Sequence, residues 1–258
     1  MNIADFQMDA FSLRGRNAIV TGGNTGLGQA FSLALAKAGA NVVMPSVMPD
    51  DPEFTALVEA QGVRAVYLHR DLTQPGVPAQ VVEHCVETLG SVDILVNSAG
   101  VSRNKHISQY GRTEWDPMVA INLTAAFEMS TEAGRRFVRQ RGGKIINICS
   151  LYSFLGGRMS PAYAATKHGM AGLTRAFCDE LGEYDVQVNG LAPGYFRTKL
   201  VEETMNDPER NRWIVDHTPD GRWGEAYDLM GATIFLASAA SRFVNGHILT
   251  VDGGFLTR

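Results

Sequence analysis

Short runs of apolar, mostly β-branched residues recur along the chain, separated by longer stretches with helical spacing. In those stretches apolar residues return every three or four positions, as in residues 29–38, where Gly39 predicts the helix end. Near-continuous apolar strands that alternate with helices are typical of a parallel sheet covered on both faces. The sequence therefore predicts a doubly wound, Rossmann-type α/β fold with a seven-stranded parallel sheet. The predicted strands are residues 18–20, 41–44, 65–68, 92–96, 144–148, 186–191 and 247–251.

The chain carries no internal repeat, low-complexity segment or linker that would divide it. We therefore expect residues 1–258 to form a single domain, which is long enough to bury a substantial core. Residues 1–10 precede the first predicted strand and are expected to be an N-terminal extension.

Composition and charge exclude several classes of partner. The formal net charge is −4 and no run of lysines and arginines occurs, so a nucleic-acid partner is not expected. Residues 17–36 form the longest uncharged stretch, but glycines and polar residues interrupt it, and it does not fit a lipid-facing helix. The N-terminus lacks the apolar core of a signal peptide. We expect a soluble protein with no membrane partner.

The cysteines and histidines point to no metal or disulfide chemistry. Three cysteines occur, none in a Cys-x-x-Cys pair, which fits reduced thiols and a cytoplasmic location. The six histidines show no metal-binding spacing, so no metal site is expected. Cys149 borders Ser150, and we interpret it as a small apolar strand residue rather than a nucleophile.

A glycine-rich loop, TGGNTGLG at residues 21–28, directly follows the first predicted strand and leads into a helix. Gly22, Gly26 and Gly28 would permit a tight turn, close approach to a phosphate and close packing of helix on strand. Backbone amides at the start of the helix would bind a pyrophosphate. A purely structural turn is the alternative. The position of the loop in the first βα unit favours a nucleotide, with Asn24, Thr25 and Leu27 also expected at the cofactor.

The end of the second strand bears on the choice between NAD and NADP. An acidic residue is expected there to bind the ribose hydroxyls of NAD, but the sequence has Ser46. No arginine or lysine lies between Asn41 and Glu53 to neutralise a 2′-phosphate. We therefore expect NAD as the cofactor, with NADP the less favoured alternative.

Tyr163 and Lys167 stand four residues apart in PAYAATKHG. On a helix these positions share a face, and a positive charge beside a phenol favours its phenolate form. Tyr163 is therefore a candidate proton donor and acceptor. The alternative is that Tyr163 packs and Lys167 reaches solvent.

With these motifs in order, the chain resembles the short-chain dehydrogenase/reductase family from Phe11 to its end. The resemblance rests on TGGNTGLG, on NSAG at 97–100, on Ser150 thirteen residues before Tyr163, on YAATK at 163–167, on PGYFRT at 193–198 and on VDGG at 251–254. It implies hydride transfer between a nicotinamide and a carbinol or carbonyl carbon. Tyr163 would move the proton, Ser150 would hold the oxygen, Lys167 would bind the nicotinamide ribose, and Asn122 in INLT would support a water.

The same resemblance implies further contacts with the cofactor. Asp71 and Leu72 would meet the adenine. The residues after the fourth strand would line the cofactor, and those after the sixth strand would close over the nicotinamide amide. These residues are Asn97, Ala99 and Gly100, then Pro193, Gly194 and Thr198.

Within the family, the segments FSLRG, TGLGQ, GGKIINICS and GRWGEAYDLMG resemble the dehydrogenases of 2-keto-3-deoxygluconate and 2-deoxygluconate. This implies a secondary alcohol or ketone of a sugar acid or polyol as the small-molecule substrate. Arg103 and Arg158 could face its carboxylate, because a guanidinium pairs with a carboxylate in a bidentate manner, and either could instead be a surface residue. Tyr195 is a third candidate substrate contact. A broad-range NADP-dependent ketone reductase and a non-catalytic nucleotide sensor are the alternative functions.

The resemblance also suggests a lid and an assembly. Residues 194–223 would be the variable region that covers substrate, although their aromatics could instead anchor two surface helices. The small residues of the Tyr163 helix would let it approach its copy in a homotetramer, or would only pack on the sheet of their own chain. They are Ala164, Ala165, Gly169, Ala171 and Gly172.

Overall fold

A computed structural model describes Ile3, residues 6–198 and residues 201–258 of the chain. Its centre is a seven-stranded sheet in the order β3-β2-β1-β4-β5-β6-β7, and every pair of neighbouring strands is parallel. This confirms the predicted fold class, and each predicted strand forms. The strands are β1 Asn17–Val20, β2 Asn41–Ser46, β3 Ala65–His69, β4 Ile94–Asn97, β5 Gly143–Ile148, β6 Val186–Pro193 and β7 Ile248–Val251.

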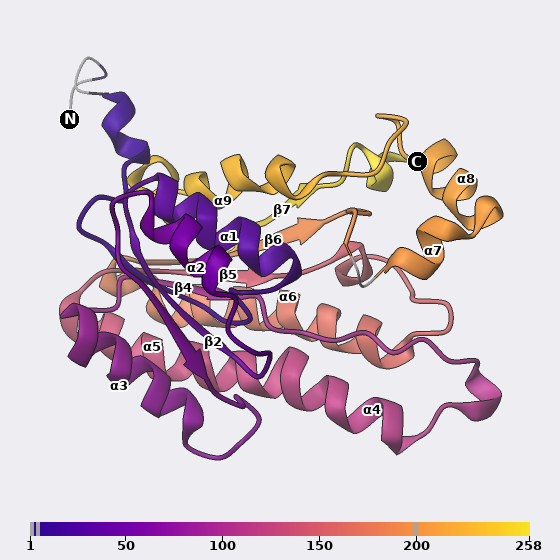
Figure 1. Cartoon of the computed structure of the whole chain (residues 1–258), viewed down its shortest axis with the longest axis horizontal. Coiled ribbons are helices and arrows are strands. Elements are labelled where there is room, and N and C mark those ends of the chain that lie inside the picture. The colour runs from indigo at the N-terminus through magenta and orange to yellow at the C-terminus, as the bar shows by residue number, and fades with distance from the viewer. Residues whose placement is uncertain (1–2, 4–5, 199–200) are drawn as a thin grey trace.

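Helices cover both faces of the sheet, as Figure 1 shows. Alternate residues of one strand point to opposite faces: Ala18 and Val20 pack into one core cluster and Ile19 into the other. The first cluster includes residues of α1 Gly26–Lys37, α2 Pro52–Glu59 and α9 Met230–Ala237. The second includes residues of α3 Val77–Leu89, α5 Ala125–Gln140 and α6 Pro161–Leu181. A further helix, α4 Arg112–Val119, leads toward α5 and contacts α6.

The ends of the helices follow local chemistry. Helix α2 starts where the Asp51 carboxylate accepts a hydrogen bond from the Phe54 amide, with Pro52 as the first helical residue. Helix α3 ends at Gly90, which adopts a left-handed conformation with φ of 96°. Caps of this kind fix where each helix begins and ends, and the loops between helices and strands lie at the two edges of the sheet.

The segment 194–223 extends beyond the sheet. Its described part includes α7 Glu202–Asn206 and α8 Pro208–His217, which lie together on the right of Figure 1; Lys199 and Leu200 lie outside the described residues. The indole of Trp223 is buried and donates a hydrogen bond to Asn211 over 2.7 Å, whereas Trp213 is half-exposed. At least one aromatic residue of this segment is therefore an anchor, and its role as a lid stays a prediction.

The described part of the N-terminal extension is largely exposed. A short 3-10 helix, Met8–Phe11, connects it to the domain, and the ring of Phe11 packs against Phe235 of α9 with centroids 6.4 Å apart. Across the described residues, no helix combines the length and the apolar character needed to cross a bilayer.

We predict that Gly28→Ala destabilises the fold. A Cβ atom at position 28 would lie 2.1 Å from the carbonyl oxygen of Gly22, so the helix and the loop would have to separate. Overpacking of this kind costs about 1–3 kcal/mol, and we expect such a fall in the free energy of unfolding in urea. The control is Gly231→Ala on α9, where nothing lies within 4 Å of the added atom. An equal loss in both variants would contradict the prediction.

Candidate active site

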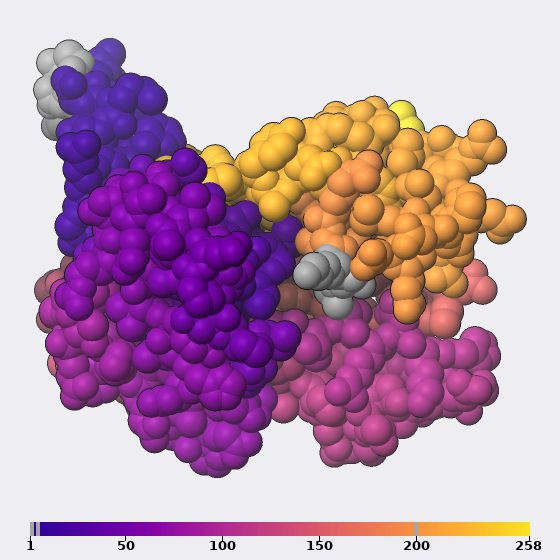
Figure 2. All heavy atoms as spheres, in the orientation of Figure 1, coloured from indigo at the N-terminus to yellow at the C-terminus, as the bar shows by residue number. Residues whose placement is uncertain are grey.

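The predicted catalytic and cofactor residues collect at the carboxyl edge of the sheet and on the adjoining helices. Strand order reverses between β1 and β4, and ligands of doubly wound folds bind at such a reversal. Figure 2 shows a recess on this face, between the orange 201–225 region and the indigo and violet first part of the chain. The topology therefore gathers residues that are far apart in the sequence into one region.

Thr21, which the sequence analysis did not assign, connects the two loops at the reversal. Its Oγ1 accepts hydrogen bonds from the amides of Ser98 and Ala99, each over 2.9 Å. A Cβ atom on Gly22 would lie 3.2 Å from the Cα atom of Ala99. The loops that follow β1 and β4 are thus in contact. The sequence signal that could have identified Thr21 is its position directly before the first glycine of TGGNTGLG.

The glycine loop fits a bound phosphate. Gly26 begins α1 with φ of 52°, and open space surrounds the position where its Cβ would lie. Amides at a helix N-terminus that face open space can donate to an anion. Asn24 is 2% exposed and donates to the Pro49 carbonyl over 2.8 Å, while its Oδ1 is buried with no described partner. Thr25 and Leu27 lie in the same turn, so the loop offers a cradle of the predicted kind.

Ser46 is the last residue of β2, and its main chain contacts the main chain of a cationic residue from the end of the adjacent strand. In the sheet register Ser46 pairs with His69, and the amide of Arg70 donates to the Ser46 carbonyl over 2.9 Å. Arg70 itself is exposed. Spacing along the chain did not reveal this neighbour, because it comes from the adjacent strand.

The two residues predicted at the adenine differ in their surroundings. The carboxylate of Asp71 accepts hydrogen bonds from Thr73 and Gln74, and these bonds hold the pKa of Asp71 below its usual value. The side chain of Leu72 is 3% exposed and packs in the core, which leaves its main chain as the part able to meet a ligand.

Asn97 is buried inside the fold. Its Nδ2 donates to Ser130 of α5 and to Asn147 of β5, each over 2.8 Å. The side chain therefore joins β4 to its neighbours. The adjacent Ala99 and Gly100 continue the loop, and a Cβ on Gly100 would lie 3.1 Å from Oδ1 of Asn122.

Ser150 follows β5 and begins a short 3-10 turn. Its Oγ accepts a hydrogen bond from the Tyr152 amide over 3.2 Å, and its own amide donates to Ser153 Oγ over 3.2 Å. The hydroxyl of Ser153 in turn donates to the Lys167 carbonyl over 2.8 Å. Ser150 therefore caps local backbone, and its hydroxyl proton remains available to another acceptor.

Tyr163 and Lys167 lie one turn apart on α6. The ammonium of Lys167 is 5.5 Å from the centroid of the Tyr163 ring and donates to the Ile148 carbonyl over 2.6 Å. Lys167 is only 6% exposed, whereas Tyr163 is partly open to solvent. The helix therefore places the two side chains together as the sequence predicted, and Lys167 does not simply reach solvent.

Asn122 sits in a π-helical turn, Ala120–Thr124, between α4 and α5. Its Oδ1 accepts from the Val101 amide over 2.8 Å, and its Nδ2 donates to the Val101 carbonyl over 2.9 Å. Turns of this type inside helices are frequent at functional sites. Asn122 thereby holds the loop that follows β4 against the base of the site.

Two loops that carry predicted substrate residues are joined across the site. The Lys105 amide donates to the Met159 carbonyl over 2.7 Å, which brings the loop of Arg103 beside the loop of Arg158. Lys105 also contacts Glu114 over 2.7 Å, and this bond holds the pKa of Glu114 below its usual value. Both arginines are exposed, and Arg103 donates to the Thr113 carbonyl over 3.2 Å.

Tyr195, the third candidate substrate residue, lies in an aromatic cluster with Trp223 and Phe255. Burial, and next the neighbouring Tyr152, raise the pKa of Tyr195, so it stays a neutral phenol. The ring of Tyr152 packs edge-on against Tyr163 with centroids 5.8 Å apart. Tyr152 was not predicted, and it connects the cluster to the catalytic helix.

The end of β6 packs closely on the turn after β7. The Gly194 amide donates to the Val251 carbonyl over 2.9 Å, and a Cβ at Gly194 would lie 2.7 Å from the Cα of Asp252. Pro193 is buried in the strand, and Thr198 lies at the end of the described part of this loop.

The thiols do not form a nucleophilic or metal centre. Burial raises the pKa of Cys149, which keeps this thiol protonated and unreactive. Among the described residues, no group of three or more histidine, cysteine, aspartate or glutamate side chains could hold a metal ion. The groups that the structure describes at this edge include the hydroxyls of Ser150 and Tyr163 and the ammonium of Lys167.

Comparison with known proteins identifies the family. A family model described as short chain dehydrogenase matches residues 16–209. The chain belongs to the short-chain dehydrogenase family. Enzymes of this family use a nicotinamide cofactor and act on CH–OH groups, so the chain is an oxidoreductase of that type.

Its relatives span its whole length. The uncharacterized oxidoreductase YgcW of Escherichia coli strain K12 is 55% identical over 98% of this chain and 97% of its own. The 2-dehydro-3-deoxy-D-gluconate 5-dehydrogenase of the same strain is 42% identical over 97% of this chain and 99% of its own. This second match confirms the resemblance seen in the sequence segments.

A solved structure supports the fold and the kind of cofactor. The gluconate 5-dehydrogenase of Burkholderia cenocepacia J2315, in complex with NADP and tartrate, is 36% identical to this short-chain dehydrogenase and has a TM-score of 0.91. The match covers 97% of this chain and 98% of that chain.

Proposed function

We propose that this short-chain dehydrogenase transfers a hydride between a nicotinamide cofactor and a secondary alcohol or ketone of a sugar acid. The observation that carries the proposal is the placement of Lys167 against the Tyr163 ring, at the edge of the sheet that holds the glycine loop and Ser150. A nucleotide sensor would need the glycine loop but not this pair.

In the proposed mechanism, each residue acts on the substrate oxygen or on its proton. The bound nicotinamide supplies or accepts the hydride. Tyr163 donates a proton to the oxygen during reduction and accepts it during oxidation. Ser150 donates a hydrogen bond to the same oxygen and stabilises its developing charge. Lys167 lies against the Tyr163 ring, where it would bind the nicotinamide ribose, and Asn122 holds the loop that follows β4.

The proposed substrate class rests on the relatives and on two arginines. Relatives with 42% and 39% identity are named 2-dehydro-3-deoxy-D-gluconate 5-dehydrogenase and 5-keto-D-gluconate 5-reductase. Arg103 and Arg158 stand on joined loops beside the site, and guanidinium groups suit a carboxylate. Residues 194–223, with Tyr195, would cover the bound substrate.

We expect the enzyme to turn over sugar acids, and we expect the Tyr163→Phe substitution to abolish this turnover. A screen of gluconate-type acids, polyols and cyclic ketones with both cofactors, followed at the absorbance of the reduced nicotinamide, should find a sugar acid as the best substrate. Loss of the phenolic proton should lower kcat about 100-fold or more, with cofactor binding retained. Lys167→Ala should lower both kcat and the affinity for the cofactor.

The matched control is Tyr227→Phe, because Tyr227 is 67% exposed and lies in the turn before α9. Equal rates for the wild type and Tyr163→Phe would refute the mechanism. Turnover of simple ketones alone would instead favour a broad-range ketone reductase.

We further propose that Ser46 and Arg70 decide between NAD and NADP. The absence of arginine and lysine between residues 41 and 53 favours NAD, because NAD has no 2′-phosphate that would need a cationic partner. Ser46 carries no charge that would repel a 2′-phosphate, and Arg70 directly follows the adjacent strand β3, with its amide bonded to the Ser46 carbonyl. The NADP bound in a solved relative is consistent with such an arrangement.

We expect Arg70→Ala to lower kcat/KM for NADP about tenfold or more, because a charge-assisted contact contributes about 1.5–3 kcal/mol. The value for NAD should stay within about twofold, since NAD lacks the phosphate. Arg64→Ala, at the other end of β3, is the control. Equal losses with both cofactors would assign Arg70 a structural role only.

We also propose a cytoplasmic homotetramer. The small residues of α6 divide between two environments: Ala164 and Ala171 are buried, and a Cβ on Gly169 would lie 2.9 Å from Leu123 of the same chain. Ala165 and Gly172 face outward, with open space around Gly172, and offer a surface to a second copy. Light scattering of the wild type should give the mass of four chains. Gly172→Trp should lower the measured mass, because the bulky side chain would keep the two copies of α6 apart. A monomer in the wild type would contradict the proposal.

A further inference from the structure

A cavity of about 680 Å³ opens at the amino edge of the sheet, opposite the candidate active site. Its walls come from the starts of β4, β5 and β6, from the segment before β1 and from the turn after α9. Cavities that bind small molecules have volumes of about 300–1,000 Å³. This cavity is therefore large enough for a metabolite, and the family chemistry does not use it.

Basic residues outnumber acidic ones in the walls of the cavity, which include Arg16, Arg141, Lys144 and Arg242 against Asp93 and Asp185. Arg16 is paired with Asp93 over 3.4 Å. Among the residues that the structure describes, no ion pair engages Lys144, Arg141 or Arg242. The positive charge of the cavity is therefore not neutralised by its own walls.

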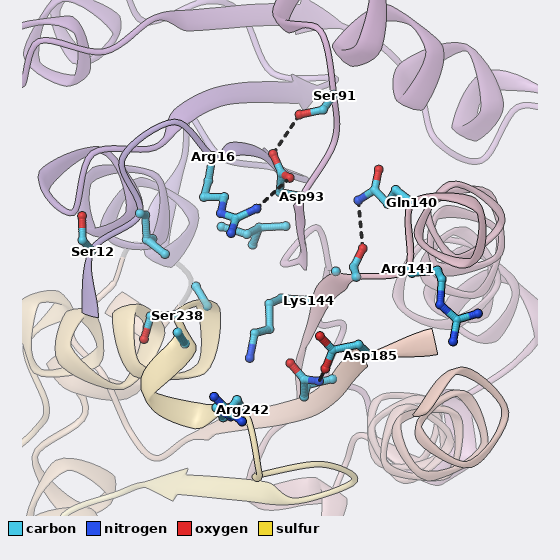
Figure 3. A pocket seen from close by; sticks show the side chains of 17 residues that line it. Ser12, Arg16, Ser91, Asp93, Gln140, Arg141, Lys144, Asp185, Ser238 and Arg242 are labelled. Atoms are coloured by element: carbon cyan, nitrogen blue, oxygen red, sulfur yellow. Dashed lines mark hydrogen bonds and ion pairs between the residues drawn. The ribbon is translucent and has the colours of Figure 1, made fainter. Parts of the chain in front are cut away.

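Lys144 is the central group. Figure 3 shows its side chain in the middle of the cavity, with Arg242 beyond its amine. Its Nζ has one long contact, 3.4 Å to Ser241 Oγ. Burial lowers the pKa of Lys144 to about 8, and the attraction of Asp185 only partly opposes this shift. An ammonium group at this position lacks the partner that a buried charge requires.

We propose that this cavity binds the phosphate ester of a sugar or sugar acid. The dianionic phosphate lies between Lys144 and Arg242, where it receives charge-assisted hydrogen bonds from both. Ser238 lines the same part of the cavity.

The remaining wall suits the hydroxyl groups of a sugar. Asp93, Gln140 and Gln187 offer carboxylate and amide groups along one side of the cavity. Asp93 is held in place by the Asn17 amide and by Ser91, each over 2.9 Å. Fixed acceptors of this kind recognise sugar hydroxyls, whereas inorganic phosphate alone would leave them unused.

The site is separate from the chemistry. Lys144 lies near the start of β5 and Ser150 follows its end, six residues further along the chain, so a span of about 20 Å separates them. A ligand at the amino edge therefore contacts neither the cofactor nor the substrate. Its binding can be measured with both of those sites filled.

The test is calorimetry on the enzyme saturated with its nicotinamide cofactor, with glucose 6-phosphate, inorganic phosphate and glucose as probes. Glucose 6-phosphate should bind, inorganic phosphate more weakly, and glucose not detectably. Lys144→Met and Arg242→Ala should each weaken binding about tenfold or more. Near pH 8 the heat should depend on the ionisation enthalpy of the buffer, because Lys144 takes up a proton, and Lys144→Met should abolish this dependence.

Lys37→Met is the control, because it removes the same charge from an exposed position on α1 outside the cavity. Absence of glucose 6-phosphate binding in the wild type would overturn the proposal. So would binding that neither Lys144→Met nor Arg242→Ala weakens. Arg242 is exposed, so its loss tests the site even if Lys144→Met does not fold. Equal affinities for the ester and for inorganic phosphate would refute recognition of the sugar.

Discussion

The candidate active site depends on one buried ammonium group. Lys167 is removed from solvent, and its Nζ donates to the last carbonyl of β5. Because a buried charge needs a hydrogen-bond partner, this contact holds α6 against the end of the strand. Ser153, in the 3-10 turn that follows β5, adds a bond from its hydroxyl to the Lys167 carbonyl of α6. Tyr163 and Ser150, which come from different parts of the chain, acquire a defined relative position in consequence.

Strands and glycine positions could be predicted because their causes are local. A strand buried on both faces must be apolar throughout, and a turn with positive φ favours glycine, so both leave a trace in the sequence. Thr21 and Arg70 illustrate what could not be predicted. Their importance arises from neighbouring segments of the fold. Thr21 accepts hydrogen bonds from the amides that follow β4, and the Arg70 amide donates to the carbonyl of Ser46 at the end of β2.

The small residues of α6 show a related limit. Sequence alone groups Ala164, Ala165 and Gly172 by size, whereas the helix divides them between its inner and outer faces. Asn97 is predicted at the cofactor because of its motif; its side chain turns into the core, and its place at the cofactor stays a prediction. A motif locates a segment reliably, but the direction of each side chain depends on what packs beside it.

The π-helical turn at Ala120–Thr124 affects more than Asn122. Such a turn is equivalent to one additional residue in an α-helix, and one residue changes the helical phase by about 100°. Met118 before it and Met129 after it are both buried, and Asn122 between them points to the β4 loop. Removing a single residue here would convert the turn into regular α-helix and keep α4 and α5 in phase, but it would take away the wide turn that presents Asn122 to the β4 loop.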